Sequence, residues 1–539
     1  MKTKQRRADA ALAANPRPPG LSTLRRLATL AFCALLSACV SLPENYPREE
    51  SVTLDGPETR VARTVWNDLE TRPGQSAAYP LAEGMEALAA RVNLARAAER
   101  SLDVQYYIWH ADEAGRILLK ELLDAADRGV RVRVLLDDLG VGAADDSAFL
   151  LFEAHPRVSI RLFNPIALRN ARTLGLVTDP IRMNQRMHNK SMTADNRATI
   201  VGGRNIGNEY FSLDELVNFA DLDVLAAGPV VSQVSDSFDA FWNSPASFPL
   251  SAFHDTPRGA DELAAARKDL DAWLAANAAR YYDAMRDTPI GIDLSPRELF
   301  FYHGRITTLS DRPEKVLGEN PERLVDQLGN LLGRIDEDLL IISPYFVPGK
   351  EGVRALNAAA ARGAQVRVYT NSLAATDVAA VHAGYRKSRR DLLAGGVELY
   401  EMMPRLAADE AGERSLAFSG SSGASLHAKM FIIDRRRVFI GSLNLDPRSI
   451  DLNTEIGLLI ESPELAAHLA AGIERTQDNA FYSVRLEPDN PGEPGGSGKL
   501  IWVEHRDGAT IEYDKEPQTT AWQRFMVRFI SLFPIDSQL

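Results

Sequence analysis

Cysteine is almost absent from this sequence, which has Cys33 and Cys39 as its only two in 539 residues. A disulfide framework is therefore not expected to stabilise the folded part of the chain. The apolar run at residues 27–36 is too short to span a bilayer. With 45% hydrophobic and 25% charged residues, the chain has the composition of a folded globular protein. Its length exceeds one ordinary core, so we expect two domains or one duplicated unit.

The N-terminal 39 residues have the order of an export signal. Residues 1–26 carry seven Lys or Arg against one Asp, and the apolar run and the small residues before Cys39 follow. The ending Leu36-Ser37-Ala38-Cys39 resembles the lipobox of bacterial lipoproteins. We therefore expect residues 1–38 to be removed and Cys39 to be lipidated, which leaves no thiol to pair. An uncleaved anchor or a plain signal with a chance Cys is the alternative.

The chain is acidic, with a formal net charge of −12. Removal of residues 1–38, which hold seven basic residues and one acidic residue, makes the charge −18. Such a chain is repelled by a phosphate polymer unless its basic residues are concentrated locally. Nucleic acid is therefore not an expected partner.

A period of nearly 240 residues runs through the chain. Residues 101–108 have the pattern of a buried strand, and a helical pattern and a second apolar run at 130–136 follow. Residues 339–346, another helical pattern and residues 365–369 repeat this order. Strand, helix and strand in succession are typical of the βαβ unit. The sequence predicts an α/β fold of two pseudo-symmetric halves, each a mixed β-sheet flanked by helices.

Composition divides the rest of the chain. Residues 256–285 are rich in Ala, Asp and Arg at helical spacing, and 488–498 are rich in Pro and Gly, which is typical of an exposed linker or hairpin tip. We expect a signal at 1–38, a tether at 39–79, the first half at 80–255, a helical connector and loop at 256–320, the second half at 321–485, and a linker with an amphipathic C-terminal helix at 486–539.

One motif occurs twice with the same spacing. His188, Lys190, Asp195, Gly202 and Asn205 recur 239 positions later as His427, Lys429, Asp434, Gly441 and Asn444. Residues two apart on a strand point to the same face, so each His and its Lys project together. A turn at each Asp reverses the chain into an apolar strand, which brings each Asn back towards its own His–Lys pair.

Two His, two Lys and two Asn at one interface supply the groups for phosphodiester transfer without a metal. The reaction needs a nucleophile, an acid for the departing alkoxide, and positive charge and donors on the phosphoryl oxygens. A neutral imidazole attacks phosphorus to form a phosphohistidine, and a protonated imidazole gives its proton to the leaving alcohol. Each half alone lacks one of these imidazoles, so we expect the active site at the interface between the halves, with no metal and no cofactor.

The paired frame resembles the HxK(x)4D(x)6G(S/G)xN motif of the phospholipase D superfamily, and the resemblance extends from about residue 80 to 485. Residues 106–109, 188–190, 202–207 and 516–537 are similar to the cardiolipin synthase branch of that superfamily, in particular to its peripheral C type. This resemblance implies two phospholipase D-like halves.

The resemblance also implies roles for residues of the frame. His188 is expected to be the nucleophile and His427 the general acid. Asp221 and Glu455 are expected to orient the two imidazoles. The residues expected to hold the phosphate are Lys190, Lys429, Asn205, Asn444 and Ser442.

Asp195 and Asp434 complete the catalytic motifs, and the resemblance implies a structural role for both. Gly203 stands where the second half has Ser442, so the resemblance leaves open whether both halves contribute a hydroxyl to the site.

Other polar residues have simpler interpretations. Asp137 and Asp138 follow a buried strand, but no third ligand keeps a spacing with them, so we expect a strand end or loop cap rather than a metal site. Residues 435–437 are interpreted as a hairpin turn, with attraction of anionic headgroups as the alternative. The seven His outside the motifs are expected to be surface or core residues, although His110 is a candidate to line the cleft.

The C-terminal segment places Trp522, Phe525, Phe529 and Phe533 at helical spacing, with arginines between them. We expect an amphipathic helix that packs on the protein, with a position in the membrane interface as the alternative. The helix can pack on the protein and lie in the membrane interface at the same time if the active site opens beside the helix.

These features favour a lipid-anchored enzyme of the bacterial envelope that faces the periplasm and transfers a phosphatidyl group to a second phospholipid, giving cardiolipin. Phosphatidylglycerol and phosphatidylethanolamine are the expected substrates, and Val40 after the lipidated Cys favours the outer membrane by analogy. The alternatives are a hydrolytic phospholipase D, a phosphodiesterase or nuclease of the same superfamily, and a non-catalytic membrane scaffold. The sequence does not indicate an oligomeric state.

Overall fold

The computed structural model describes residues 42–533 except 45, 62–68, 70, 142–144, 168, 170–171, 173–178, 215–217, 255, 293–298, 333–334, 405–424, 488–497 and 507. The predicted signal and Cys39 lie outside these residues, and so does nearly all of the predicted linker at 488–498. Within the described part of the chain, no helix combines the length and apolar character needed to span a bilayer.

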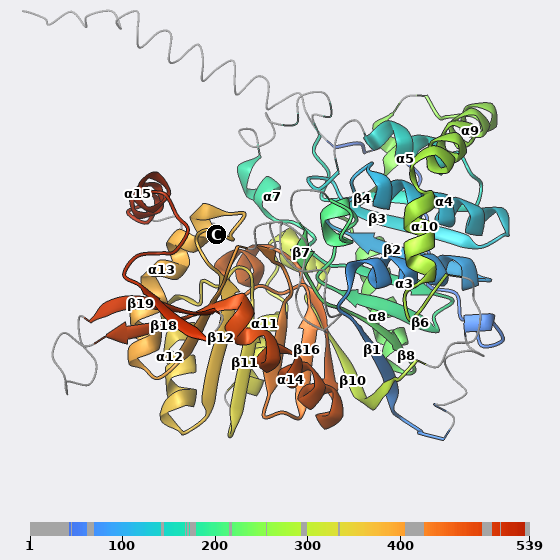
Figure 1. Ribbon diagram of the computed structural model, residues 1–539. Coiled ribbons are helices and arrows are strands. Elements are labelled where there is room, and N and C mark those ends of the chain that lie inside the picture. Colours follow the sequence, from blue (N-terminus) through green and yellow to red (C-terminus); the bar gives the residue numbers. More distant parts are fainter. Residues whose placement is uncertain are drawn as a thin grey trace, which may run out of the picture.

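A mixed sheet of 18 strands runs through the described residues, and its two ends are built alike (Figure 1). The pairing order is β9-β4-β3-β2-β5-β6-β8-β1-β10-β17-β16-β15-β11-β12-β13-β18-β19-β20. The strands of the first half are β1 (Ser76–Leu81), β2 (Ser101–Tyr106), β3 (Arg131–Asp137), β4 (Val158–Phe163), β5 (Ser191–Ala194), β6 (Ala198–Gly202), β8 (Asp223–Ala227) and β9 (Ser247–Pro249). Those that follow are β10 (Tyr302–Ser310), β11 (Asp338–Ile342), β12 (Gln365–Asn371), β13 (Glu398–Met402), β15 (Met430–Ile433), β16 (Arg437–Gly441), β17 (Ile456–Glu461), β18 (Phe481–Glu487), β19 (Lys499–Arg506) and β20 (Ala509–Tyr513).

Helices cover this sheet in each half. They are α3 (Gly84–Ala97), α4 (Glu113–Asp127), α5 (Asp145–Glu153), α7 (Pro180–Asn184), α8 (Val230–Trp242), α9 (Ala260–Asn277), α10 (Ala279–Arg286), α11 (Leu324–Leu332), α12 (Gly349–Ala361), α13 (Ala379–Ala394), α14 (Pro463–Ala480) and α15 (Ala521–Ile530). The helices α9 and α10 pack outside α3 and α4, and α15 packs outside α13 (Figure 1).

The predicted βαβ units are present in both halves. The strands β2 and β3 are parallel across α4, and β11 and β12 are parallel across α12. The strands β2 and β11 are buried along their whole length, as is typical of parallel strands with helices on both faces, and β11 is mostly apolar whereas β2 alternates polar and apolar residues. Asp112 caps α4 by accepting a hydrogen bond from the Gly115 amide. The α/β fold with two similar halves is therefore confirmed.

Two strands join the halves where the sequence predicted a tether and a loop. β1 begins at Ser76, inside the predicted tether, and β10 lies inside the predicted loop. They pair with each other, and β10 also pairs with β17, which makes the sheet continuous. The loop prediction was wrong for residues 302–310. Prolines on both sides favoured a loop, and a strand whose burial alternates has no continuous apolar run.

The predicted tether and C-terminal linker also contain ordered structure. The backbone amide of Thr53 donates to Asp239, and the buried guanidinium of Arg133 donates to the Ser51 carbonyl, so this part of the tether packs on the first half. The strands β19 and β20 extend the edge of the second half, where only a linker and a helix were expected.

Gly304 provides a test of the joint between the halves. A Cβ at this position would lie 2.2 Å from the Glu461 carbonyl oxygen of β17, whereas a Cβ at Gly329 in α11 meets nothing within 4 Å. We predict that Gly304→Ala lowers the free energy of unfolding by about 1–3 kcal/mol, because β10 has to move away from β17. Gly329→Ala is the matched control and should leave the melting temperature unchanged or raised. Equal melting temperatures for the two variants would contradict this view of the joint.

Candidate active site

The two motif segments lie just before strands β5 and β15. Each Asp of the motif begins the tight turn of a hairpin, β5–β6 or β15–β16, with φ of 54° at Asp195 and 51° at Asp434. The His and Lys positions belong to the extended segment that leads into the strand rather than to the strand itself. In the second half the His and Lys side chains lie together, since Lys429 Nζ is 3.0 Å from His427 Nδ1, whereas Lys190 Nζ donates to the His188 carbonyl at 2.5 Å.

Each histidine contacts a carboxylate that belongs to the other half. His188 Nδ1 lies 2.8 and 3.0 Å from the two carboxylate oxygens of Glu455. His427 Nδ1 lies 2.5 Å from Asp221 Oδ2. Asp221 and Glu455 occupy equivalent positions, each two residues before the partner of the motif glycine in β8 or β17. The two halves therefore exchange their orienting groups.

The backbone follows the same crossed pattern. The His188 amide donates to the Thr454 carbonyl at 2.9 Å, and the His427 amide donates to the Ala220 carbonyl at 2.8 Å. A short parallel pair, β7 (Phe219–Ala220) and β14 (Ser425–Leu426), secures the second crossing. Both histidines are therefore fixed by main chain and side chain of the opposite half.

The two lysines are almost fully buried beside these pairs. Lys429 Nζ donates to the His427 carbonyl and lies 3.0 and 3.2 Å from the two ring nitrogens of His427. Burial lowers the pKa of Lys190 well below its usual range, and it lowers that of Lys429 to about 8 although Asp221 and Glu455 act in the opposite direction. A phosphodiester between the lysines brings the negative charge that favours their ammonium forms.

The electrostatic environments of the histidines differ. Burial and the charges of both lysines lower the pKa of His188 well below its usual range, so this imidazole is neutral. Burial and Lys429 also lower the pKa of His427, but Asp221 opposes them. Burial also disfavours the ionised form of Asp221, yet contacts with His427 and Lys429 outweigh it and hold its pKa below the usual range. The pKa of His427 is therefore also below its usual value, but ionised Asp221 makes His427 easier to protonate than His188.

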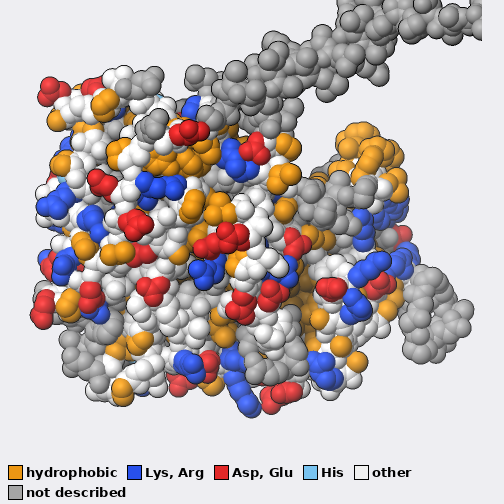
Figure 2. All heavy atoms as spheres, turned by 180° about the vertical axis from the view of Figure 1, so that it is seen from behind, with side chains coloured by type: hydrophobic (Ala, Val, Ile, Leu, Met, Phe, Trp, Pro, Cys, Tyr) orange, Lys and Arg blue, Asp and Glu red, His pale blue; other side chains and the backbone are white. Residues whose placement is uncertain are grey.

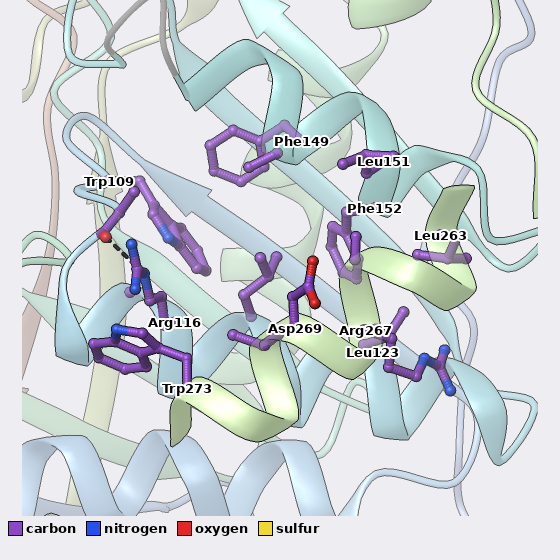
Figure 3. A pocket seen from close by; sticks show the side chains of 16 residues that line it. Trp109, Arg116, Leu123, Phe149, Leu151, Phe152, Leu263, Arg267, Asp269 and Trp273 are labelled. Carbon is purple, nitrogen blue, oxygen red and sulfur yellow. Dashed lines mark hydrogen bonds between the residues drawn. The ribbon is translucent and has the colours of Figure 1, made fainter. Parts of the chain in front are cut away.

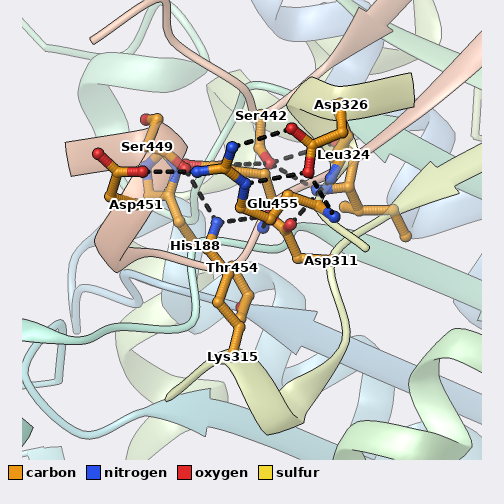
Figure 4. A network of polar contacts seen from close by, with 12 residues as sticks. His188, Asp311, Lys315, Leu324, Asp326, Ser442, Ser449, Asp451, Thr454 and Glu455 are labelled. Carbon is orange, nitrogen blue, oxygen red and sulfur yellow. Dashed lines mark hydrogen bonds and ion pairs between the residues drawn. The ribbon is translucent and has the colours of Figure 1, made fainter. Parts of the chain in front are cut away.

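Burial raises the pKa of Glu455 to about 7, although Lys190 and the hydroxyl of Ser442 act in the opposite direction. A network behind this carboxylate holds it in place (Figure 4). Ser442 Oγ donates to Glu455 Oε2 at 2.5 Å, and the Glu455 amide donates to Asp311. Lys315 Nζ donates to the same Asp311 oxygen at 3.0 Å. The Ser442 hydroxyl therefore supports Glu455, whereas the sequence interpretation had it hold the phosphate.

Gly203 is explained by close approach to Asp221. A Cβ at this position would lie 2.2 Å from Asp221 Oδ1, so a serine like Ser442 does not fit here without displacing that carboxylate. The Leu222 amide donates to Asp221 Oδ1 at 2.8 Å in its place. The two halves thus support their carboxylates in different ways.

The motif asparagines differ in their partners. Asn205 accepts from the Ile108 amide at 3.2 Å and donates to the Tyr210 hydroxyl at 3.0 Å. Asn444 is 4% exposed, and its Oδ1 has no hydrogen-bond partner in the described part of the chain. Phosphate contact for either residue remains a prediction.

Aromatic rings enclose the histidines, and sequence reasoning gave them no role. Tyr107 lies edge-on to His188 at 5.3 Å, and Tyr210 lies edge-on to His427 at the same centroid distance. Phe219 is 5.0 Å from the His427 ring. Tyr107 stands in the quoted stretch 106–109 and Tyr210 five residues after Asn205, but an aromatic residue near a motif is no signal by itself.

The carboxylates of Asp195 and Asp434 accept hydrogen bonds from backbone amides. Asp195 accepts hydrogen bonds from the amides of three successive residues, Glu99, Arg100 and Ser101. Asp434 accepts from the amides of Asp336, Glu337 and Asp338 in the same way. Each carboxylate ties its hairpin to the start of the central strand of its half.

Asp137 and Asp138 are engaged with protein groups. Asp137 accepts from the Met187 and Leu139 amides, and Asp138 accepts from the Ile166 amide and pairs with Arg169. The geometry corresponds to the strand end and loop cap that the sequence favoured.

Two other features involve Trp109 and His110. An apolar cavity of about 360 Å³ between α4, α5 and α9 is lined by Trp109, Phe149 and Trp273 among others, and neither motif histidine lines it (Figure 3). His110, Asp112 and Glu209 bring possible metal-ligand atoms within 4.8 Å of one another, but both Asp112 oxygens accept backbone amides. The chemistry is therefore assigned to the crossed histidine site.

A two-lobed α/β fold with a His, Lys and Asn from each lobe defines the class of phospholipase D-like phosphodiester-transferring enzymes. The family model described as "Cardiolipin synthase, PLD-like domain" matches residues 92–242 and 329–476. Since the match covers more than half of the chain, the protein belongs to this family.

Relatives support the assignment. Cardiolipin synthase C of Escherichia coli (strain K12) is 44% identical over 485 residues, which cover 88% of this chain and 99% of that protein. Cardiolipin synthase B of Salmonella typhi is 28% identical over 364 residues, or 67% of this chain and 71% of that protein. The crystal structure of phosphatidylserine synthase from Haemophilus influenzae Rd KW20 shares the fold, with a TM-score of 0.54, 16% identity, and coverage of 89% of this chain and 99% of that one.

The pKa of about 7 for Glu455 predicts a pH dependence. With His188 as the predicted nucleophile, a Glu455 carboxyl that is protonated below this value no longer accepts a hydrogen bond from His188 Nδ1, so the ring proton moves to Nε2 and attack is blocked. We expect kcat/KM to rise through about pH 7 and to fall above about pH 8 as Lys429 loses its proton. Glu455→Gln should lower kcat/KM by roughly 10²-fold and remove the acid limb at pH 7, because the amide does not titrate. The exposed Glu337→Gln is the matched control, and an acid limb at pH 7 in Glu455→Gln would contradict the assignment.

The backbone contacts of Asp195 predict that its replacement lowers the stability of the protein but leaves the rate of the chemical step nearly unchanged. Asp195→Ala leaves three amides without their acceptor and places Ala at a positive φ, so we expect a loss of about 2–4 kcal/mol in stability, measured by thermal unfolding. Below its melting temperature the variant should keep kcat within a few-fold of wild type. Asp434→Ala should behave alike, and the exposed Asp261→Ala should change neither value. An inactive Asp195→Ala variant with an unchanged melting temperature would require a catalytic role.

Proposed function

We infer that the protein is a phosphatidyltransferase that makes cardiolipin from phospholipids. Its membership of the cardiolipin synthase family and its similarity to cardiolipin synthase C support this function. The observation that carries the chemistry is the crossed pairing of His188 with Glu455 and of His427 with Asp221. It provides two imidazoles with different electrostatic surroundings at one interface.

The first step forms a phosphohistidine on His188. Glu455 accepts the Nδ1 proton, so the lone pair of Nε2 attacks the phosphorus of the donor lipid. The bond from phosphorus to the headgroup oxygen breaks, and protonated His427 gives its proton to the departing alcohol. Lys190 and Lys429 stabilise the charge on the phosphoryl oxygens.

The second step reverses these roles. Neutral His427 takes the proton from a hydroxyl of the acceptor lipid, and the resulting oxygen attacks the phosphorus as the bond to Nε2 breaks. With phosphatidylglycerol as acceptor, the product is cardiolipin. Phosphatidylglycerol and phosphatidylethanolamine are the proposed donors, and these choices rest on the sequence interpretation.

The proposed location is the bacterial envelope, with Cys39 lipidated and the enzyme facing the periplasm. The lipobox-like ending at Cys39 supports this proposal. It places the active site next to its lipid substrates.

Product analysis tests the activity. The purified full chain is incubated with vesicles that contain both phosphatidylglycerol and phosphatidylethanolamine, and lipids are identified by mass spectrometry. We expect cardiolipin and the free headgroup alcohol or amine in equal amounts. Phosphatidic acid as the only product would instead define a hydrolytic phospholipase D, and no lipid turnover would contradict the proposal.

The roles of the histidines are tested with a phosphatidyl ester of p-nitrophenol, whose anion leaves without a proton. His427→Asn should release one equivalent of p-nitrophenolate and stop, because His427 is needed only to activate the acceptor. The adduct should be acid-labile and located on His188 by peptide mass spectrometry. His188→Asn is the matched variant and should show no burst, with turnover reduced at least about 10³-fold. A burst in His188→Asn and none in His427→Asn would reverse the assignment.

A further inference from the structure

The C-terminal helix α15 carries a row of exposed aromatic side chains. Ring centroids are 5.6 Å apart for Trp522 and Phe525, 6.3 Å for Phe525 and Phe529, and 5.1 Å for Phe529 and Phe533. Trp522 is 67% exposed, and Leu532, directly before the last ring Phe533, is 79% exposed. Figure 2 shows a prominent apolar knob at the edge of the molecule that carries α15 in Figure 1. A contiguous exposed patch of this kind marks an interaction surface.

The protein holds this row outward. Val527, on the opposite side of α15, is buried against Leu373 and Ala383. Just before the helix, Glu516 accepts a hydrogen bond from Arg389 of α13 at 3.2 Å, and the same carboxylate oxygen lies 3.2 Å from Nε2 of His382. Burial opposes the ionisation of Glu516, but these partners lower its pKa to about 2. The helix is therefore held against α13 in the unbound protein. Binding of a partner does not have to order it, so no conformational entropy of the helix is lost on binding.

Positive charge surrounds the aromatic row. Arg386, Lys387 and Arg390 of α13 and Arg528 of α15 are half-buried or exposed. Burial lowers the pKa of Arg386, and the nearby charges of Arg389, Arg528 and Arg390 add to this effect. Figure 2 shows Lys and Arg side chains directly beneath the apolar knob. This cluster of basic groups contrasts with the net charge of −12 of the whole chain.

The helix α15 is connected to the active-site region through packed residues. Leu373, which packs against α15, is two residues from Asn371, and Asn371 Nδ2 donates to the Leu426 carbonyl directly before His427. On the other side of the site, α7 leads into the His188 segment and exposes Ile181 to 79%. Both α7 and α15 lie on the upper side of Figure 1.

We propose that α15, with the basic residues of α13, is a membrane-binding surface whose aromatic row inserts into a bilayer containing anionic phospholipid. Trp and Phe suit the boundary between headgroups and acyl chains, and Arg residues at the same level pair with anionic headgroups. The acidic remainder of the chain is repelled by such a surface, so this face turns towards it. As part of the proposed function, the surface brings the site opening to its lipid substrates.

Depth-dependent quenching tests the insertion in the full-length protein. The protein is reconstituted in vesicles of phosphatidylcholine and phosphatidylglycerol, with or without bromine atoms on the acyl chains. The chain has six tryptophans, so we expect brominated lipid to quench up to about one sixth of the tryptophan fluorescence, and Trp522→Phe to remove most of the quenched part. Quenching of equal size in Trp522→Phe would overturn the proposal, because the quenched tryptophan would then lie elsewhere.

The role of charge is tested by Arg528→Gln, with Arg354→Gln as the matched control on α12, where the Arg354 side chain is 75% exposed. Arg528→Gln should reduce quenching in anionic vesicles several-fold, and phosphatidylcholine alone should give the same reduced value. Unchanged quenching in either case would contradict the part assigned to the arginines.

Activity measurements distinguish a failure of the membrane-surface proposal from a failure of the proposed function. The variant Trp522→Ser/Phe525→Ser should turn over vesicle lipids at least about 10-fold more slowly, yet match wild type on detergent-dispersed lipid. Phe300→Ser removes an aromatic side chain that is 66% exposed outside this surface, and it should change neither rate. If wild type lacks transferase activity but shows the Trp522 quenching, the membrane surface stands and the proposed function fails.

Discussion

Each motif histidine in this structure depends on a carboxylate from the opposite half, and this dependence explains why the proposed site needs a duplicated chain. A buried imidazole needs a partner on Nδ1 to fix its tautomer and leave Nε2 for chemistry. Glu455 provides this partner for His188, and Asp221 provides it for His427. Neither half forms a complete site alone, and the continuous sheet through β1 and β10 keeps the halves in register.

In this arrangement the two motifs have the same sequence frame but different electrostatic environments. Asp221 approaches the backbone of Gly203 closely and accepts a main-chain amide, whereas Glu455 is longer and accepts the Ser442 hydroxyl. Burial dominates at Glu455 and brings its pKa to about 7, while contacts with cations dominate at Asp221. The proposed assignment of one imidazole as nucleophile and the other as acid rests on this difference, because acid–base catalysis needs groups whose environments separate their pKa values.

Much of the fold and the motif could be predicted from sequence because both repeat. The apolar runs around residues 101–136 and 339–369 indicated βαβ units, and the spacing of His188 and His427 indicated a paired site. The strand β10 was missed because its burial alternates between prolines, and β1 was assigned to the tether. The crossing could not be predicted, since spacing does not specify which half a carboxylate contacts. The support that Ser442 gives Glu455 depends on the same folded contact.

The most direct test of the account is the nitrogen NMR of the histidine rings in selectively labelled protein. Asp221→Asn should change the tautomer and pKa of His427 and leave His188 as in wild type, and Glu455→Gln should do the reverse. Each variant would then alter the histidine of the other half. A change confined to the histidine in the same half as the substitution would contradict the crossed arrangement on which the mechanism depends.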